Sequence, residues 1–311
     1  MTASPLDDPD RPAASTPGHR LGGPPRLPAW TRVVIPMVLF LPIALTAALP
    51  MLVPGYTAMS QREDGLGTLA FAIAAAVALT AYVLVSWALI RWVDRRSFAA
   101  LGLRLNGRAT LGLLAGVGIA VVAGALAAWG TDALGLARAL DPEVVAQQVA
   151  RQSVLTVVVY TILRAFVLQG IGEEVLFRGY LLQSLRRHPA RAVVIAAIAF
   201  SLPHFASSGG QENLLERVLY LAVPFGFSIS AGFLAIACRS MWAAIGIHGG
   251  FHVASAINLA LGLTADGPGM WLTAGALHVV IGVVVALLIP RRRWAEVREL
   301  GPYGRSVRSG R

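Results

Sequence analysis

Two neighbouring acids and one arginine stand out within an otherwise apolar stretch of the chain. They are Glu173, Glu174 and Arg178, in the run Gly-Glu-Glu-Val-Leu-Phe-Arg-Gly at 172–179. At about 100° per residue of an α-helix, Glu174 and Arg178 share one face, so we expect an ion pair between them. Glu173 points away from that face, which makes it the better candidate for a general base or a ligand. The alternative is a helix end with solvated charges.

Three histidines occur at spacings that favour the same kind of chemistry. His204 follows Phe200 by four residues, and Pro203 predicts a bend because proline cannot donate to the carbonyl one turn earlier. His248 and His252 are also four apart, with two glycines between them. Two imidazoles at this spacing can bind one metal ion or one oxyanion from a single helix. The alternative for each histidine is a hydrogen bond to a neighbouring helix.

These groups are predicted to lie at a similar depth in their helices. Glu173 lies 13 residues before the polar turn at 186–191 and His204 lies 13 residues after it, so each is ~20 Å from that turn at ~1.5 Å per residue. Counted from the polar turn before their own helix, His248 lies about 10 Å and His252 about 16 Å along it. Three helices therefore bring two carboxylates and three imidazoles to one region.

The composition indicates what kind of element carries these residues. Apolar residues make up 56% of the 311 residues and charged residues 14%, against about 45–50% and 25% in soluble domains. A mean hydropathy of +0.66 is typical of a polytopic membrane protein. The formal charge of +10 is carried by arginines between apolar segments, which does not resemble a folded nucleic-acid-binding face, so no nucleic-acid partner is expected.

Eight apolar segments predict an all-α transmembrane bundle of about eight spans, in which the segment at 191–205 is short for a span and is expected to be kinked or partly re-entrant. Twenty arginines fall in the tails and connectors on one side and only four on the other. Because cytoplasmic loops are enriched in Lys and Arg, both termini are predicted to be cytoplasmic, in a multi-pass protein of the plasma membrane. The segments are at about 33–53, 67–90, 110–130, 153–184, 191–205, 218–238, 241–262 and 269–290.

The remaining parts of the chain are interpreted as tails. Residues 1–32 are predicted to be a disordered cytoplasmic tail, because they lack apolar periodicity. The membrane bundle is placed at 33–290, with its functional core at about 150–262, and a basic cytoplasmic tail at 291–311. Arg164 lies inside an apolar segment and is predicted to face away from the acids, because it precedes Glu173 by nine residues of regular helix.

Three motifs in order resemble those of the CPBP family, the CAAX-protease and bacteriocin-processing membrane endopeptidases. They are Glu-Glu-x-x-x-Arg from Glu173 to Arg178, Phe-x-x-x-His ending at His204, and a third motif with His248. The resemblance covers about residues 150–260 and implies a helical bundle with a cavity open to the cytosol. One position departs from the family pattern, because His252 stands where the family usually carries Asn or Asp.

The resemblance implies hydrolysis of a peptide bond and leaves two mechanisms open. In one, His204, His248 and His252, with one of the acids, hold Zn²⁺ and lower the pKa of its water. In the other, Glu173 and His204 deprotonate water while His248 and His252 stabilise the oxyanion. The zinc mechanism is favoured at this point, because three imidazoles from two helices match a catalytic zinc set with an open fourth position.

The expected activity is that of an intramembrane endopeptidase, with catalytic residues Glu173, Glu174, Arg178, His204 and His248. Its partners would be the bilayer and a membrane-associated peptide or protein, including prenylated CAAX-type substrates. One alternative is a non-catalytic membrane partner or immunity protein on the same fold, although buried charges are expensive for a binding module. Another is a proton-coupled transporter, which is disfavoured because the acidic segment has no counterpart in the other half of the chain.

Overall fold

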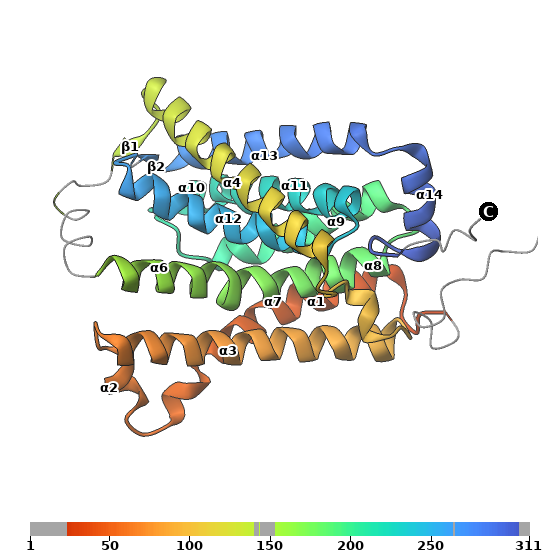
Figure 1. The fold of residues 1–311 in the computed structure, drawn as a ribbon, viewed down its shortest axis with the longest axis horizontal. Coiled ribbons are helices and arrows are strands. Elements are labelled where there is room, and N and C mark those ends of the chain that lie inside the picture. The colour runs from red at the N-terminus through yellow and green to blue at the C-terminus, as the bar shows by residue number, and fades with distance from the viewer. Residues whose placement is uncertain (1–23, 140–142, 144–152, 264, 305–311) are drawn as a thin grey trace, which may run out of the picture.

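A computed structural model describes residues 24–139, 143, 153–263 and 265–304. All eight predicted apolar segments are helical, and strand structure in the described residues is limited to one antiparallel pair of two-residue strands. The prediction of an all-α polytopic bundle is confirmed. Most of the long helices run along the length of the molecule, and α4 crosses it obliquely (Figure 1).

The first half of the described chain forms three long helical segments and their connectors. These elements are α1 (Ala29–Leu45), the 3-10 helix η1 (Thr46–Leu52), α2 (Tyr56–Ser60), α3 (Gly65–Ala88), the π-helix η2 (Leu89–Val93), the 3-10 helix η3 (Phe98–Leu101), α4 (Gly107–Ala133) and β1 (Arg138–Ala139).

The second half holds the segments on which the chemistry was expected. These elements are α6 (Val154–Ile162), the π-helix η4 (Leu163–Gly170), α7 (Ile171–Glu174), the π-helix η5 (Val175–Leu181), α8 (Leu182–Ser184), α9 (Pro189–Ser201), the 3-10 helix η6 (Leu202–Ala206), α10 (Leu214–Tyr220), α11 (Ala222–Cys238), α12 (Met241–Ala260), β2 (Ala265–Asp266), α13 (Pro268–Leu288) and α14 (Arg291–Leu300).

Seven helical segments of the described chain are long and apolar enough to cross a membrane. The eighth predicted segment, α12, is a helix of 20 residues but is not among the seven. Two histidines and Asn258 lower its mean hydropathy, and its residues from Met241 to Gly250 are buried apart from Trp242. This helix is therefore an inner element of the bundle that carries polar groups where lipid does not reach them.

Small residues allow α4 to pack closely against α12. A methyl group added at Gly116 of α4 would lie 2.4 Å from the carbonyl oxygen of Ala243, and one added at Gly246 of α12 would lie 2.3 Å from that of Leu113. Membrane helices associate largely through such close backbone packing, because lipid provides little hydrophobic drive between them. This contact holds in place the helix that carries two of the predicted site histidines.

The arginine-rich connectors gather at one end of the bundle, where α1 begins and α14 lies (Figure 1). Arg26 donates its backbone N–H to Val93, Arg32 donates to the Ser184 carbonyl at 2.9 Å, and Arg239 pairs with Glu296 at 2.7 Å. The strand pair and α10 lie at the other end. This grouping agrees with the predicted arginine asymmetry, while the side of the membrane that each end faces stays a prediction.

Both predicted tails contain ordered structure that composition did not indicate. The first helix begins at Ala29, before the expected boundary at residue 32, and residues 1–23 lie outside the described part. Within the predicted basic tail, α14 forms a helix, and buried Arg293 donates to the Ile236 carbonyl at 2.9 Å. Burial lowers the pKa of Arg293 to about 10. The same guanidinium also donates to the Pro302 carbonyl, so the buried charge of Arg293 is bound by two backbone carbonyls.

Candidate active site

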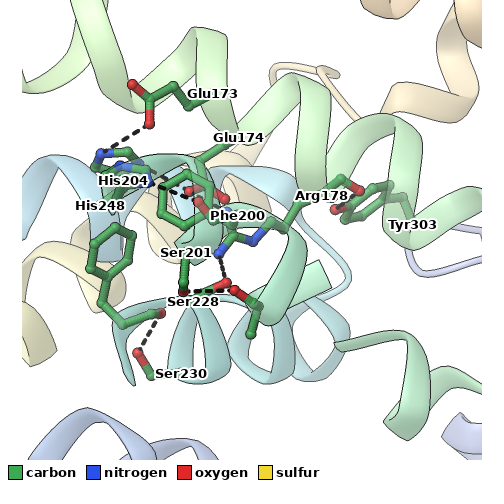
Figure 2. Close-up of polar contacts among 12 residues, drawn as sticks. Glu173, Glu174, Arg178, Phe200, Ser201, His204, Ser228, Ser230, His248 and Tyr303 are labelled. Carbon is green, nitrogen blue, oxygen red and sulfur yellow. Dashed lines mark hydrogen bonds and ion pairs between the residues drawn. The ribbon is translucent and has the colours of Figure 1, made fainter. Parts of the chain in front are cut away.

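Glu174 and Arg178 form the predicted ion pair, and both are withdrawn from solvent. Arg178 Nη1 donates to Glu174 Oε1 at 2.9 Å, and the two side chains are at most 1% exposed. The other guanidinium nitrogen, Nη2, donates to the Ser228 hydroxyl on α11, and the guanidinium carbon lies 4.8 Å from the centre of the Phe200 ring. The arginine is therefore held by three elements at once (Figure 2).

His248 is attached to this pair through one ring nitrogen. Its Nδ1 lies 3.0 Å from Glu174 Oε1, the same oxygen that accepts from Arg178. Because a carboxylate accepts, Nδ1 is the donor, and in the tautomer with its proton on Nδ1 the ring presents a lone pair at Nε2. A carboxylate bound to one ring nitrogen fixes both the tautomer and the direction of the imidazole.

The other nitrogen of the same ring faces Glu173. His248 Nε2 lies 4.0 Å from Glu173 Oε2, and the acid and the imidazole approach each other from separate helices (Figure 2). Glu173 is 4% exposed, and its carboxylate makes no hydrogen bond to any residue in the described part of the chain. The two adjacent acids thus differ: one oxygen of Glu174 accepts two hydrogen bonds, and Glu173 accepts none from the described residues.

His204 lies at the point where α9 changes to a 3-10 helix. Its Nδ1 is 2.8 Å from the Phe200 carbonyl oxygen, one turn earlier, so Nδ1 donates and Nε2 is left as an acceptor. Regular α-helix ends at Ser201 and a 3-10 helix runs on through Pro203, where the sequence predicted a bend. No described contact joins His204 to either acid by a hydrogen bond, which differs from the expectation that it acts directly beside Glu173.

Aromatic rings surround the polar groups. The Phe200 ring lies 4.5 Å from the His204 ring and 5.9 Å from the His248 ring, centre to centre. Phe227 lies 4.9 Å from His248, and Phe40 of α1 lies 5.1 Å from His204. These rings keep the dielectric low around the acids and imidazoles, which strengthens their electrostatic interactions.

His252 lies close to His248, but the three histidines do not form a metal-ligand set. The rings of His248 and His252 are 5.5 Å apart, and His204 is bound to its own helix. Within the described residues, no group of three or more His, Cys, Asp or Glu side chains is placed to hold a metal ion. The residues present therefore do not fit the zinc site expected from His204, His248 and His252, and no step of the mechanism below is derived through a metal.

Several site residues were not identifiable from the sequence. Ser228 and Phe227 lie in an apolar helix with no motif around them, and Phe40 comes from the first span. Tyr303 belongs to the predicted basic tail, yet its hydroxyl donates to the Arg178 carbonyl at 3.0 Å. A tyrosine directly after Gly-Pro beyond the last helix is the only sequence signal that could have drawn attention to it.

A large pocket lies at the end of the bundle away from the arginine-rich connectors. Its volume is about 1100 Å³, and its lining comes from α2, α3, α6 and α12 together with Arg164 of η4. Val253, the neighbour of His252, also lines it, while the acids and histidines of the site are not part of the lining. If the arginine-rich end is cytoplasmic as predicted, this pocket opens on the opposite side from the expected cytosolic cavity.

Arg164 lies on a stretch of the chain that departs from regular α-helix. The arginine is exposed, lines the pocket and comes near enough to interact electrostatically with His252. Residues Leu163–Gly170 form a π-helix, which has more residues per turn than an α-helix. The 100° per residue used to predict its direction therefore does not hold between Arg164 and Glu173, and the direction relative to the acids stays a prediction.

Comparison with known proteins identifies the segment that carries the site. Residues 155–254 match the family model of the type II CAAX prenyl endopeptidase Rce1-like proteins. No curated protein and no solved structure matched the chain. The matched residues include both acids, Arg178 and all three site histidines, so the resemblance to the CPBP family is confirmed where the chemistry was expected.

Proposed function

Because the segment that holds the acids and histidines is Rce1-like, a family that implies membrane endopeptidase activity, we propose that this protein hydrolyses peptide bonds with Glu173 as the general base. The observation that carries the proposal is the position of Glu173. Its carboxylate is buried, accepts no hydrogen bond from the described residues and faces an imidazole nitrogen that Glu174 and Arg178 hold in place.

The separation of the two acceptors suits one water molecule. Glu173 Oε2 and His248 Nε2 are 4.0 Å apart. A water oxygen about 2.8 Å from each would see them at an angle of roughly 90°, close to the angle between its own O–H bonds. Such a water donates one hydrogen to the carboxylate and one to the imidazole, and its lone pairs are left to attack a peptide carbonyl.

The proton then follows a short route. Glu173 takes a proton from the water while the water oxygen bonds to the peptide carbonyl carbon. Glu173 then gives that proton to the peptide nitrogen, which leaves as an amine when the C–N bond breaks. Glu174 accepts from both Arg178 and His248 and acts as a positioning residue. His252 has no described hydrogen-bond partner, so either ring nitrogen can donate to the oxyanion. In this mechanism, Nε2 of His204 accepts the N–H of the bound peptide.

The proposed substrate is a peptide segment held at a membrane. The large pocket is lined mainly by apolar side chains, and its lining includes Val253, the neighbour of His252. Such a lining suits an extended peptide segment with a lipid group or apolar side chains. A prenylated C-terminal peptide is the finer proposal, because the matched family is described by that substrate.

Comparing protein termini in cells tests this function. Membranes containing the wild-type protein should yield new peptide termini that are lost in the Glu173→Gln variant. Glu299 is exposed and has no described contact with the two acids, so Glu299→Gln provides a matched control and should leave those termini intact. Identical termini in wild-type and Glu173→Gln membranes would instead favour the non-catalytic partner interpretation.

A topology measurement decides from which side the substrate reaches the pocket. A periplasm-active reporter fused near Asp64, on the rim of the pocket, should be active, and one fused after Arg96 should be silent, because arginine-rich connectors are retained in the cytoplasm. The reverse result would place the pocket on the cytoplasmic side.

A further inference from the structure

A second pocket lies at the arginine-rich end, where α9 and α14 begin. Its volume is about 650 Å³. Four arginines, one histidine and one tryptophan contribute most of its lining, and they come from two elements more than a hundred residues apart in the chain. They are Arg187, His188, Arg191, Arg291, Trp294 and Arg298.

The four arginines carry charge that the protein does not neutralise. Elsewhere at this end, Arg239 and Arg293 both contact Glu296, at 2.7 and 3.4 Å. By contrast, all four arginines of the second pocket are exposed, and none of them pairs with a carboxylate or donates a hydrogen bond within the described part of the chain. Four like charges around one hollow repel one another unless an anion lies between them.

The surface beside the pocket is apolar on both helices. Leu287 and Leu288, at the end of α13, are 80% and 74% exposed, and Arg291 lies three residues after Leu288. On α9, Val194 and Ile195 are exposed just after the pocket-lining residues. Trp294 is half-buried against Phe233, with ring centres 6.2 Å apart. Tryptophan prefers the boundary between lipid and water, so this pocket lies where headgroups meet acyl chains.

We propose that this pocket binds the phosphate-bearing headgroup of an anionic phospholipid. The guanidinium groups would hold the phosphate oxygens, as arginine does in planar, two-pronged hydrogen bonds. The acyl chains would extend along the exposed leucine and valine side chains. A free phosphate ion would pair with the arginines but would leave the apolar side chains beside the pocket uncovered. A lipid makes both kinds of contact and is therefore the favoured ligand.

Lipid retention by the purified protein tests the proposal. The detergent-solubilised protein is incubated with equal amounts of phosphatidylglycerol and phosphatidylcholine, and the bound lipid is measured by native mass spectrometry. Wild-type protein should retain phosphatidylglycerol preferentially. The Arg291→Gln/Arg298→Gln variant should bind it about thirtyfold more weakly, as expected when two arginines near a lipid surface are removed.

A matched variant separates the pocket from net charge. Arg108 and Arg292 are also exposed at this end without a described partner but do not line the pocket, so Arg108→Gln/Arg292→Gln removes the same charge and should retain phosphatidylglycerol like the wild type. If Arg291→Gln/Arg298→Gln does not fold, Arg187→Gln/Arg191→Gln replaces it with the same expected loss. Equal retention by the pocket variant and the control variant overturns the proposal.

Inorganic phosphate distinguishes the two sources of the anion. Millimolar phosphate should displace phosphatidylglycerol only partly, because it lacks the apolar contacts. Complete displacement at that concentration, or retention of phosphatidylcholine equal to that of phosphatidylglycerol, also overturns the lipid site.

Discussion

The two nitrogens of the His248 ring face two identical and adjacent acids, but the surroundings of these acids differ. On the Nδ1 side, Glu174 accepts from both His248 and Arg178, and Ser228 and Phe200 hold the arginine in turn. On the Nε2 side, Glu173 is as buried but makes no hydrogen bond within the described residues. Identical side chains one residue apart can therefore divide into a positioning group and a reacting group, because a helix points them towards different neighbours.

The largest effect is expected on the Nε2 side. Glu173→Gln keeps the shape of the side chain but removes its basicity, so the rate of peptide cleavage should fall by about 10²–10⁴-fold, the usual contribution of a general base. The unfolding temperature should stay close to that of the wild type. The measurement is cleavage by purified protein in nanodiscs, with Glu299→Gln as the control. Full activity in the Glu173 variant would end the assignment of this acid as the base.

On the Nδ1 side, removing the acid should damage the fold as well. Glu174→Gln leaves Arg178 as a buried charge without its carboxylate, which costs about 3–5 kcal/mol. Both the unfolding temperature and the yield of folded protein should drop. The double variant Glu174→Gln/Arg178→Met removes both charges and should recover part of the stability without recovering activity. Equal instability in the single and double variants would contradict the role of the pair.

A smaller loss of stability is expected at Ser228. Ser228→Ala removes one hydrogen bond to a charged group, worth about 1.5–3 kcal/mol, and loosens the arginine that holds Glu174. Ser255 on α12 is a useful control because its hydroxyl bonds only within its own helix at an exposed position. Thermal unfolding of Ser228→Ala and Ser255→Ala compares the two. An unchanged unfolding temperature in Ser228→Ala would show that Arg178 does not depend on α11.

Replacing His252 should have a modest effect on activity. The His252→Asn variant restores the usual family residue, and its amide can still donate to an oxyanion, so cleavage should stay within about tenfold of the wild type. Metal content is measured on the same samples. Stoichiometric zinc in active wild-type protein, together with loss of metal and activity in this variant, would reinstate the zinc mechanism.

The smallest effect is expected at a third buried acid, outside the site. Burial raises the pKa of Asp94, and the opposing effects of nearby charges, first of all Arg32, are smaller. An acid with a raised pKa in the folded state stabilises the fold below its unfolded pKa of about 3.9 and loses that contribution as the pH rises through the folded value. Asp94→Asn should therefore flatten the fall of unfolding temperature over that range. An unchanged slope would show that Asp94 is not the group responsible.

Helices and the local ion pair could be predicted because both depend on short-range pattern. Hydropathy located all eight helical segments, and the i, i+4 spacing of Glu174 and Arg178 indicated their contact. Proline chemistry likewise indicated a departure from regular α-helix near Pro203, which the structure shows as a 3-10 helix. In each case the deciding interaction lies within one helix.

The remaining features depend on how separate helices pack. Nothing near His248 in the sequence shows that its Nδ1 meets Glu174 rather than a metal ion, because that contact joins α12 to α7. Ser228 is one of several serines in apolar helices, and only the fold selects it. Counting along a regular helix also cannot anticipate a π-helical stretch such as the one that contains Arg164.

The bond between Tyr303 and the Arg178 carbonyl has a practical consequence for handling this protein. The phenol reaches the backbone of the helix that bears both acids, although 125 residues of chain separate the two. A purification tag, a truncation or a protease site placed close to residue 303 thus acts on the same helix as a change at the acids themselves. Expression designs should keep the chain unbroken through Tyr303 and attach any tag at the other terminus.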